Sequence, residues 1–250
     1  MKATILGLGW VTAGGWGPAG AAAGFALAHG ELPELARRDV FADPFQRYGR
    51  LDRFSRLGLA AIAFALRDAG LEAWQQKRPV GVIAATRYGC LATDTGYFDT
   101  VLPAGGSLAS PNLFAYTLPN CFLGEAAIRF GLTGTSFIVS GDAPGRLGAL
   151  RLAMESLAWG EEAMVLAGCC DLGPPPGFAA AADVPPGAVF AVLTLAAGSG
   201  YGEVAIAGDG VFRLNGETIC DWSDLVRAAL PTGGGKFIET CITVEKDKRP

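Results

Sequence analysis

Apolar strand-like runs alternate with helical stretches along most of the chain, and this alternation constrains the fold more than any other feature. Near-continuous apolar runs are typical of strands buried on both faces. They predict strands at residues 4–9, 80–85, 135–139, 163–167 and 188–195. The remaining pattern predicts helices at 17–29, 52–69, 121–130 and 147–159, a long loop at 86–111 and an irregular, proline-rich loop at 173–186. Strands that alternate with helices indicate a layered α/β architecture, here a mixed, mostly parallel sheet with helices packed on it.

The alternation weakens toward the C-terminal end of the sequence. Asn215-Gly216 is a hairpin turn signal, and a short helix is predicted to begin with a cap near Ser223. We therefore expect one domain over residues 1–210, with residues 211–250 as an extension that packs on it or is loosely attached.

Composition and charge exclude several classes of function. Half of the 250 residues are hydrophobic and 18% are charged, which is enough apolar material for one sizeable core. A net charge of −4 and the lack of basic runs argue against nucleic acid as a partner. No apolar run approaches the ~20 residues needed to span a membrane. Glycines interrupt the apolar stretch after Lys2, so we expect a buried first strand there rather than a secretory signal, and a cytoplasmic protein.

Residues 111–171 resemble the nucleophile region of a β-ketoacyl synthase. In that family a strand like FIV runs into a tight turn that carries a cysteine, followed by a helix like LGALRLAMESLAWG and a buried strand like EAMVLAG. Three earlier stretches are similar to the family's preceding motifs, in the same order: ATILGLGWVTAGGWG, GRLDRFSRLGLAAIAFALRDAGLE and VGVIAATRYG. The resemblance implies one half of a thiolase-like fold.

Counting from Val139, the resemblance places the family's nucleophilic cysteine at Ala143. Alanine has no atom that can attack a thioester, so covalent acyl transfer through this position is chemically impossible. The second half of the family's enzymes, which carries two catalytic histidines, has no counterpart in this sequence, whose only histidine is His29. We expect His29 on the surface or at a helix end rather than in the role of a base. The resemblance thus implies no catalytic residue for condensation in this chain.

The turn around this position keeps several other residues of interest, namely Ser140, Gly141, Asp142, Pro144, Gly145 and Arg146. Asp142 either caps the following helix or pairs with Arg146 to fill the former acyl pocket. Ser140 is not expected to act as a nucleophile, because no histidine is available as its base. Cys121 is a substitute candidate, since the first turn of a helix lowers the pKa of a thiol; its alternative is ordinary packing.

No cofactor or metal site is predicted. The run from Gly7 through Gly9 has threonine, Thr12, where a dinucleotide fingerprint needs its third glycine. The glycine run before Lys236 is followed by Phe237, where a phosphate-binding loop needs serine or threonine. No His, Cys or Asp residues have the spacing of metal ligands.

Three functions remain. The first is a catalytically inactive synthase-like subunit of fatty-acid, polyketide or aryl-polyene biosynthesis, paired with itself or with a complete ketosynthase. The family dimerises through the strand before the turn, which the resemblance places at Thr135, Ser136, Phe137, Ile138 and Val139.

The second possible function is binding of an acyl chain or an acyl carrier protein. For this function a cluster of arginines is either a docking surface or merely a solvated face: Arg37, Arg38, Arg47, Arg50, Arg53 and Arg56. The third is an acyltransferase completed by another polypeptide, with Cys121 or another cysteine as nucleophile. We favour the first.

Overall fold

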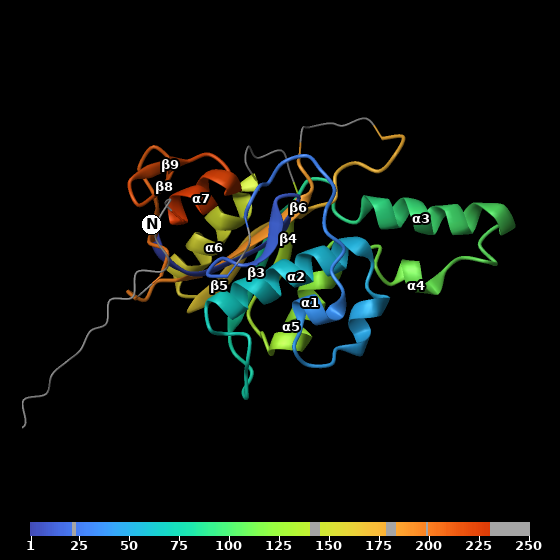
Figure 1. Cartoon of the computed structure of the whole chain (residues 1–250), viewed down its shortest axis with the longest axis horizontal. Coiled ribbons are helices and arrows are strands. Elements are labelled where there is room, and N and C mark those ends of the chain that lie inside the picture. Colours follow the sequence, from blue (N-terminus) through green and yellow to red (C-terminus); the bar gives the residue numbers. More distant parts are fainter. Residues whose placement is uncertain (22–23, 141–145, 179–183, 199, 231–250) are drawn as a thin grey trace, which may run out of the picture.

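The computed structural model describes residues 1–21, 24–140, 146–178, 184–198 and 200–230. Within these ranges one mixed sheet of nine strands forms the centre of the molecule (Figure 1). Its order is β4-β3-β5-β6-β1-β7-β8-β9, and β2 pairs with β1 off this path. The strands are β1 (Lys2–Thr12), β2 (Gly15–Pro18), β3 (Val80–Thr86), β4 (Ser136–Ser140), β5 (Met164–Asp171), β6 (Gly187–Thr194), β7 (Glu203–Ile206), β8 (Phe212–Leu214) and β9 (Glu217–Ile219). The layered, mixed α/β architecture predicted from the sequence is confirmed.

The strand directions correct one part of that prediction. β3 runs parallel to both of its neighbours, β4 and β5. All other strand pairings within the described sheet are antiparallel. Parallel strands need a crossover connection between them. The segment between β3 and β4 contains α5 (Cys121–Phe130), and the segment between β4 and β5 contains α6 (Gly148–Trp159), so the chain returns each time to start a parallel strand. No helix lies between β7, β8 and β9, so these strands follow one another through short turns and run antiparallel. The expectation of a mostly parallel sheet was therefore wrong.

Helices cover both faces of the sheet. The helical segments are α1 (Arg37–Val40), η1 (Gln46–Arg50), α2 (Arg53–Asp68), α3 (Leu91–Val101), η2 (Leu102–Ala104), α4 (Pro111–Phe114), α5 (Cys121–Phe130), α6 (Gly148–Trp159) and α7 (Trp222–Ala229). α2 and α5 lie on one face, and α6 and α7 on the other (Figure 1). Each face of the sheet carries its own hydrophobic core, the first beneath α2 and α5 and the second beneath α6 and α7. Side chains along β5 alternate between them: Leu166 and Cys170 belong to the first core, and Val165, Ala167 and Cys169 to the second.

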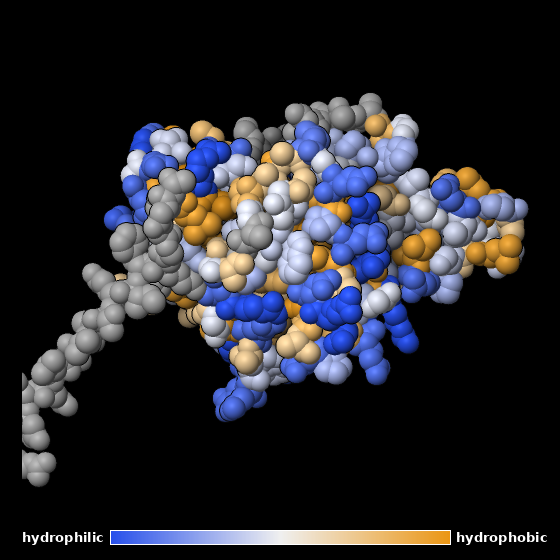
Figure 2. All heavy atoms as spheres, viewed as in Figure 1, coloured by the Kyte–Doolittle hydropathy of each residue, from blue (hydrophilic) through white to orange (hydrophobic). Residues whose placement is uncertain are grey.

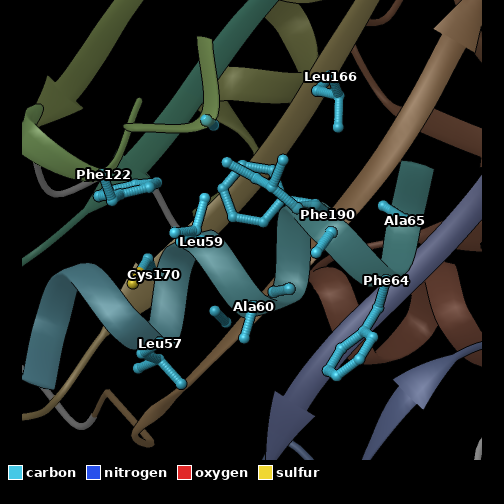
Figure 3. Packing of buried hydrophobic residues seen from close by; sticks show 14 of the residues in the cluster. Leu57, Leu59, Ala60, Phe64, Ala65, Phe122, Leu166, Cys170 and Phe190 are labelled. Carbon is cyan, nitrogen blue, oxygen red and sulfur yellow. The ribbon is translucent and has the colours of Figure 1, made fainter. Parts of the chain in front are cut away.

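The core beneath α2 depends on close approach between helix and sheet. Figure 3 shows Leu59 of α2, Phe122 of α5 and Phe190 of β6 converging in this core. A Cβ atom added at Gly9 of β1 would lie 2.1 Å from the backbone nitrogen of Ala65, which no side chain tolerates. This packing explains the glycines of β1 that imitate a nucleotide-binding motif.

Two local predictions were wrong. The segment predicted as a helix at 17–29 contains β2 and non-helical chain in its described part, because Gly17 and Gly24 adopt φ values of 132° and 81°. His29 is therefore exposed but lies outside any helix. The predicted loop at 86–111 contains the eleven-residue helix α3 and the start of α4.

The described part of the extension, up to residue 230, packs on the second core. The hairpin prediction is confirmed, since β8 and β9 meet at Asn215 and Gly216, which have φ values of 53° and 89°. Helix α7 follows, capped by Asp221, whose carboxylate accepts a hydrogen bond from the Asp224 amide at 2.8 Å. Trp222 at its start is fully buried. Among the described residues, no helix combines the length and the apolar character that crossing a membrane requires.

Candidate functional site

β4 ends the strand order and leaves one of its edges unpaired among the described residues. Ser136 and Ser140 are exposed, and the three residues between them are half-buried. The Val82 amide donates to the Thr135 carbonyl at 2.8 Å. Successive residues of a strand direct their N–H and C=O groups to opposite sides, so Phe137 also bonds toward β3, whereas the N–H groups of Ser136 and Ile138 point away from the sheet. The edge thus offers free hydrogen-bonding groups flanked by apolar side chains.

The nucleophile turn itself lies mostly outside the described residues. These omit 141–145 and with them Gly141, Asp142, Ala143, Pro144 and Gly145. The two alternatives for Asp142 therefore stay predictions. Arg146, the last residue of the turn, is described, and it pairs with Asp171 at the end of β5.

Asp171 is the centre of a buried polar cluster. The Arg146 guanidinium nitrogen lies 3.1 Å from one of its carboxylate oxygens, and Asp171 has 0% of its surface exposed. The other oxygen accepts hydrogen bonds at 2.9 Å from the Thr86 hydroxyl and from the backbone amides of Arg87 and Tyr88. Two strand ends and the start of the α6 segment are thereby joined through one carboxylate.

The electrostatics of this cluster keep Arg146 charged. Burial acts to lower the pKa of Arg146, but the neighbouring acidic groups of Cys169 and Asp171 raise it above its usual value. Arg146 also has a positive φ of 58°, and its carbonyl accepts a hydrogen bond from the Trp222 indole at 3.1 Å. Sequence reasoning missed Asp171, although an acidic residue that ends an otherwise apolar buried strand was a visible signal.

Cys121 occupies the first turn of α5, as predicted, but its thiol is not activated. It is half-buried, and its sulfur lies 3.3 Å from the Ala115 carbonyl oxygen. Burial raises the pKa of the Cys121 thiol, and the negative charges of Asp52 and Glu125 raise it further. The lowered pKa that its helix position predicted was therefore wrong, because burial and carboxylates outweigh the helix terminus here.

The buried cysteines are also poor nucleophiles. Burial and the neighbouring Asp94 raise the pKa of Cys90 to about 12, and burial raises that of Cys169 to about 11. Burial also raises the pKa of Cys170. Cys220 is exposed. Across the described ranges, no three His, Cys, Asp or Glu side chains converge as a metal site requires.

An apolar arm projects from the body of the molecule beside this site. It consists of α3, η2, α4 and their connections, residues 91–118, and stands clear of the sheet (Figure 1). Apolar side chains gather at its tip (Figure 2). Its exposed large apolar residues are Phe98, Leu102, Leu108, Phe114 and Leu118. A groove of about 420 Å³ runs between Leu91 and Phe98 of α3 and Phe178. Exposed apolar surface of this kind marks an interaction site.

The arginine cluster is split by the fold. Arg47 is bound to the buried Glu125, and Arg37 donates to the Asp43 carbonyl. The side chains of three others form no hydrogen bond or ion pair within the part of the chain that the structure describes, and they line a pocket of about 590 Å³ beside the proline-rich loop: Arg50, Arg53 and Arg56. With three arginines in its lining, this pocket is suited to an anionic ligand.

The fold is shared with solved ketosynthase structures. Residues 30–183 match the model of the family "Beta-ketoacyl synthase, N-terminal domain", which is more than half of the chain. The chain belongs to this family. No curated protein matches its sequence.

Solved structures with the same fold include ketosynthases and their complexes. One is a ketosynthase (ApeO) in complex with its chain length factor (ApeC) from Xenorhabdus doucetiae, with 20% identity and a TM-score of 0.56 over 80% of this chain and 81% of that chain. The ishigamide ketosynthase/chain length factor matches at 19% identity and a TM-score of 0.59, over 78% of this chain and 63% of that chain. A β-ketoacyl synthase from Burkholderia phymatum STM815 matches at 22% identity and a TM-score of 0.56, over 78% and 59%.

The covered shares differ between these neighbours in an informative way. The chain spans less than two thirds of the ishigamide and Burkholderia chains. In the Xenorhabdus complex, the alignment covers 80% of this chain and 81% of the matched chain, so the two chains have nearly the same length. A chain of this size thus occurs within a ketosynthase complex.

Proposed function

We propose that this protein is a catalytically inactive ketosynthase-like subunit that pairs with a complete ketosynthase, or with a second copy of itself, in the cytoplasmic biosynthesis of an acyl chain. The pathway class is fatty-acid, polyketide or aryl-polyene synthesis. The observation that carries the proposal is the β4 edge, unpaired among the described residues, together with an exposed apolar arm. Both features are hazards for a lone chain and are removed when another chain covers them.

The geometry of the edge favours pairing by strand addition. Ser136 and Ile138 present outward N–H groups, so an incoming strand finds a regular ladder of donors and acceptors. Phe137, Ile138 and Val139 are only half-buried and would be covered further by a partner. The arm adds apolar contact area from residues such as Phe98 and Leu102. Two of the similar structures are themselves ketosynthases with chain length factors, which supports a heteromeric partner.

The chemistry of the site favours an inactive role. Ala143 takes the nucleophile position that the family resemblance assigns, and alanine cannot form an acyl-enzyme. The raised pKa of Cys121 leaves its thiol protonated at neutral pH, which argues against the acyltransferase alternative.

A second candidate, binding of an acyl carrier protein, rests on three arginines that have no carboxylate partner among the described residues, Arg50, Arg53 and Arg56. They line one pocket and leave their positive charge available to an acidic carrier. This function is compatible with the first, because the pocket and the β4 edge are formed by different residues.

Intact-protein mass spectrometry tests the proposal. The chain is incubated with acyl-carrier-protein thioesters, alone and with the Xenorhabdus ketosynthase ApeO, and its native mass is measured in the same samples. We expect a dimer or a hetero-complex and no added acyl mass on this chain. An acyl adduct on Cys121 or on any other residue would show that the chain is an enzyme, and a monomer in every sample would refute the subunit role.

A further inference from the structure

The C-terminal elements make two separate contacts at the start of α6, one with the chain just before the helix and one with the helix itself. Residues 201–230, which comprise β7, β8, β9 and α7 and are called the C-terminal strap below, contribute ten residues to the core on the α6 side of the sheet: Tyr201, Val204, Phe212, Leu214, Ile219, Trp222, Leu225, Val226, Ala228 and Ala229. α6 supplies Ala149, Leu150, Ala153, Met154 and Leu157 to the same core. The strap and α6 therefore share one hydrophobic core.

The first contact is polar and lies just before α6 begins. The Trp222 indole N–H donates to the Arg146 carbonyl at 3.1 Å, and Trp222 is 0% exposed. Arg146 in turn is held by the buried carboxylate of Asp171, which also accepts from the Arg87 and Tyr88 amides. α7 is thereby connected to the ends of β3 and β5 through one residue in a left-handed backbone conformation.

The second contact lies within α6. The Arg151 guanidinium donates to the Gly210 carbonyl at 3.0 Å, and its charged carbon lies 5.1 Å from the ring centroid of Phe212. The turn between β7 and β8 thus holds the solvent side of α6. The two contacts from one segment thus involve the residue Arg146 just before the helix and Arg151 in its first turn.

We propose that the C-terminal strap clamps α6 and the residue before it onto the sheet, with Trp222 as the positioning residue and the Arg146–Asp171 pair as its anchor. The clamp holds the start of α6 in place from within the chain. This role concerns the chain by itself and does not depend on the proposed partner.

Amide hydrogen exchange in the Trp222→Phe variant tests the clamp. Phenylalanine retains an aromatic ring in the core but removes the N–H donor. Exchange at Arg87, Tyr88 and Leu147 is expected to accelerate at least tenfold, while amides within α2 keep their rates, because a local loosening does not open the far core. The control is Trp74→Phe, which removes another indole hydrogen bond, to the Arg129 carbonyl at 2.9 Å, at a tryptophan that lies outside the strap and is 38% exposed.

A second variant keeps the test decisive if Trp222→Phe fails to fold. Arg151→Met retains an unbranched apolar stem but loses the contacts with Gly210 and Phe212, and we expect exchange in the first half of α6 to accelerate at least threefold. Equal rates at Arg87, Tyr88 and Leu147 in wild type and Trp222→Phe, or equal effects of Trp222→Phe and Trp74→Phe there, would overturn the proposal. So would unchanged exchange in α6 of Arg151→Met.

Discussion

The two ends of the sheet are finished in different ways. At one end β9 is a three-residue strand with Glu217 and Thr218 exposed, and helix α7 packs beside it. At the other end β4 is a five-residue strand with Phe137, Ile138 and Val139 half-buried. A short strand with a charged side chain discourages pairing with another chain, whereas a longer apolar edge invites it. The comparison teaches that the described chain covers one end of the sheet with its own helix, whereas the other end keeps the features that strand pairing requires.

The largest expected effect concerns the closed part, at the anchor of the strap. Asp171→Asn removes the counter-charge of the buried Arg146, and breaking a buried pair in this way costs about 3–5 kcal/mol. Urea unfolding of the variant should show a correspondingly lower free energy of unfolding. Lys2→Gln, which breaks the exposed pair with Glu203, is the control and should change stability little. A loss below about 1 kcal/mol in Asp171→Asn would mean that the cluster does not stabilise this region.

The next effect concerns the open end. Ser136→Pro removes an outward N–H group of β4 without removing a bond to β3, so the strand stays paired within the chain. An incoming strand loses at least one hydrogen bond and meets the proline ring, which we expect to weaken association by about 2 kcal/mol, or roughly 30-fold in Kd. Sedimentation equilibrium measures the change. Ser136→Ala keeps the N–H group and should bind within about threefold of wild type; equal affinities of the two variants would exclude pairing through this edge.

The arm should contribute a smaller share of the same interface. Phe98→Ser removes the aromatic ring of a residue that is 57% exposed in the single chain. We expect about a tenfold weaker association, near 1.4 kcal/mol, with an almost unchanged unfolding midpoint, because the side chain supports no core. Trp159→Ser, which removes another exposed ring on the C-terminal end of α6, is the matched control and should leave association unchanged. The reverse result would place the partner on α6.

The smallest effect separates the thiols by reactivity. The raised pKa of Cys121 means fewer thiolates at any given pH, and its burial slows access further. Alkylation at neutral pH should therefore modify the exposed Cys220 at least tenfold faster than Cys121, with the Cys121 rate rising as the pH increases. Peptide mass spectrometry after timed quenching reports both rates. A Cys121 that reacts first would restore it as a candidate nucleophile.

Local signals predicted much of the fold. The segment 121–130 was predicted as a helix and is α5 with the same bounds, and the strand predicted at 135–139 is β4, Ser136–Ser140. In both segments, the apolar pattern that predicts the element lies within one short stretch of sequence. α3 escaped detection because Thr93 is its only buried residue, so no apolar stripe marks the helix.

The candidate site was less predictable than the fold. The resemblance identified the turn and β4, but the cluster that holds Arg146 joins residues 25 positions apart with strand ends more than 80 positions away. Such contacts arise only when the strands are assembled. The pKa of Cys121 was misjudged for the same reason, since Asp52 approaches it from another helix. Strand direction depends likewise on which strands become neighbours, and sequence periodicity does not contain that information.

Backbone amide exchange of β4, measured with and without association, tests the central claim most directly. Samples of the chain alone at rising concentration, and with the ketosynthase ApeO, would be followed at Ser136 and Ile138 and at Thr218 of β9. The account predicts that exchange at Ser136 and Ile138 slows at least tenfold when the native mass shows a complex, while Thr218 keeps its rate. A complex that forms with no change at Ser136 and Ile138 would contradict the account.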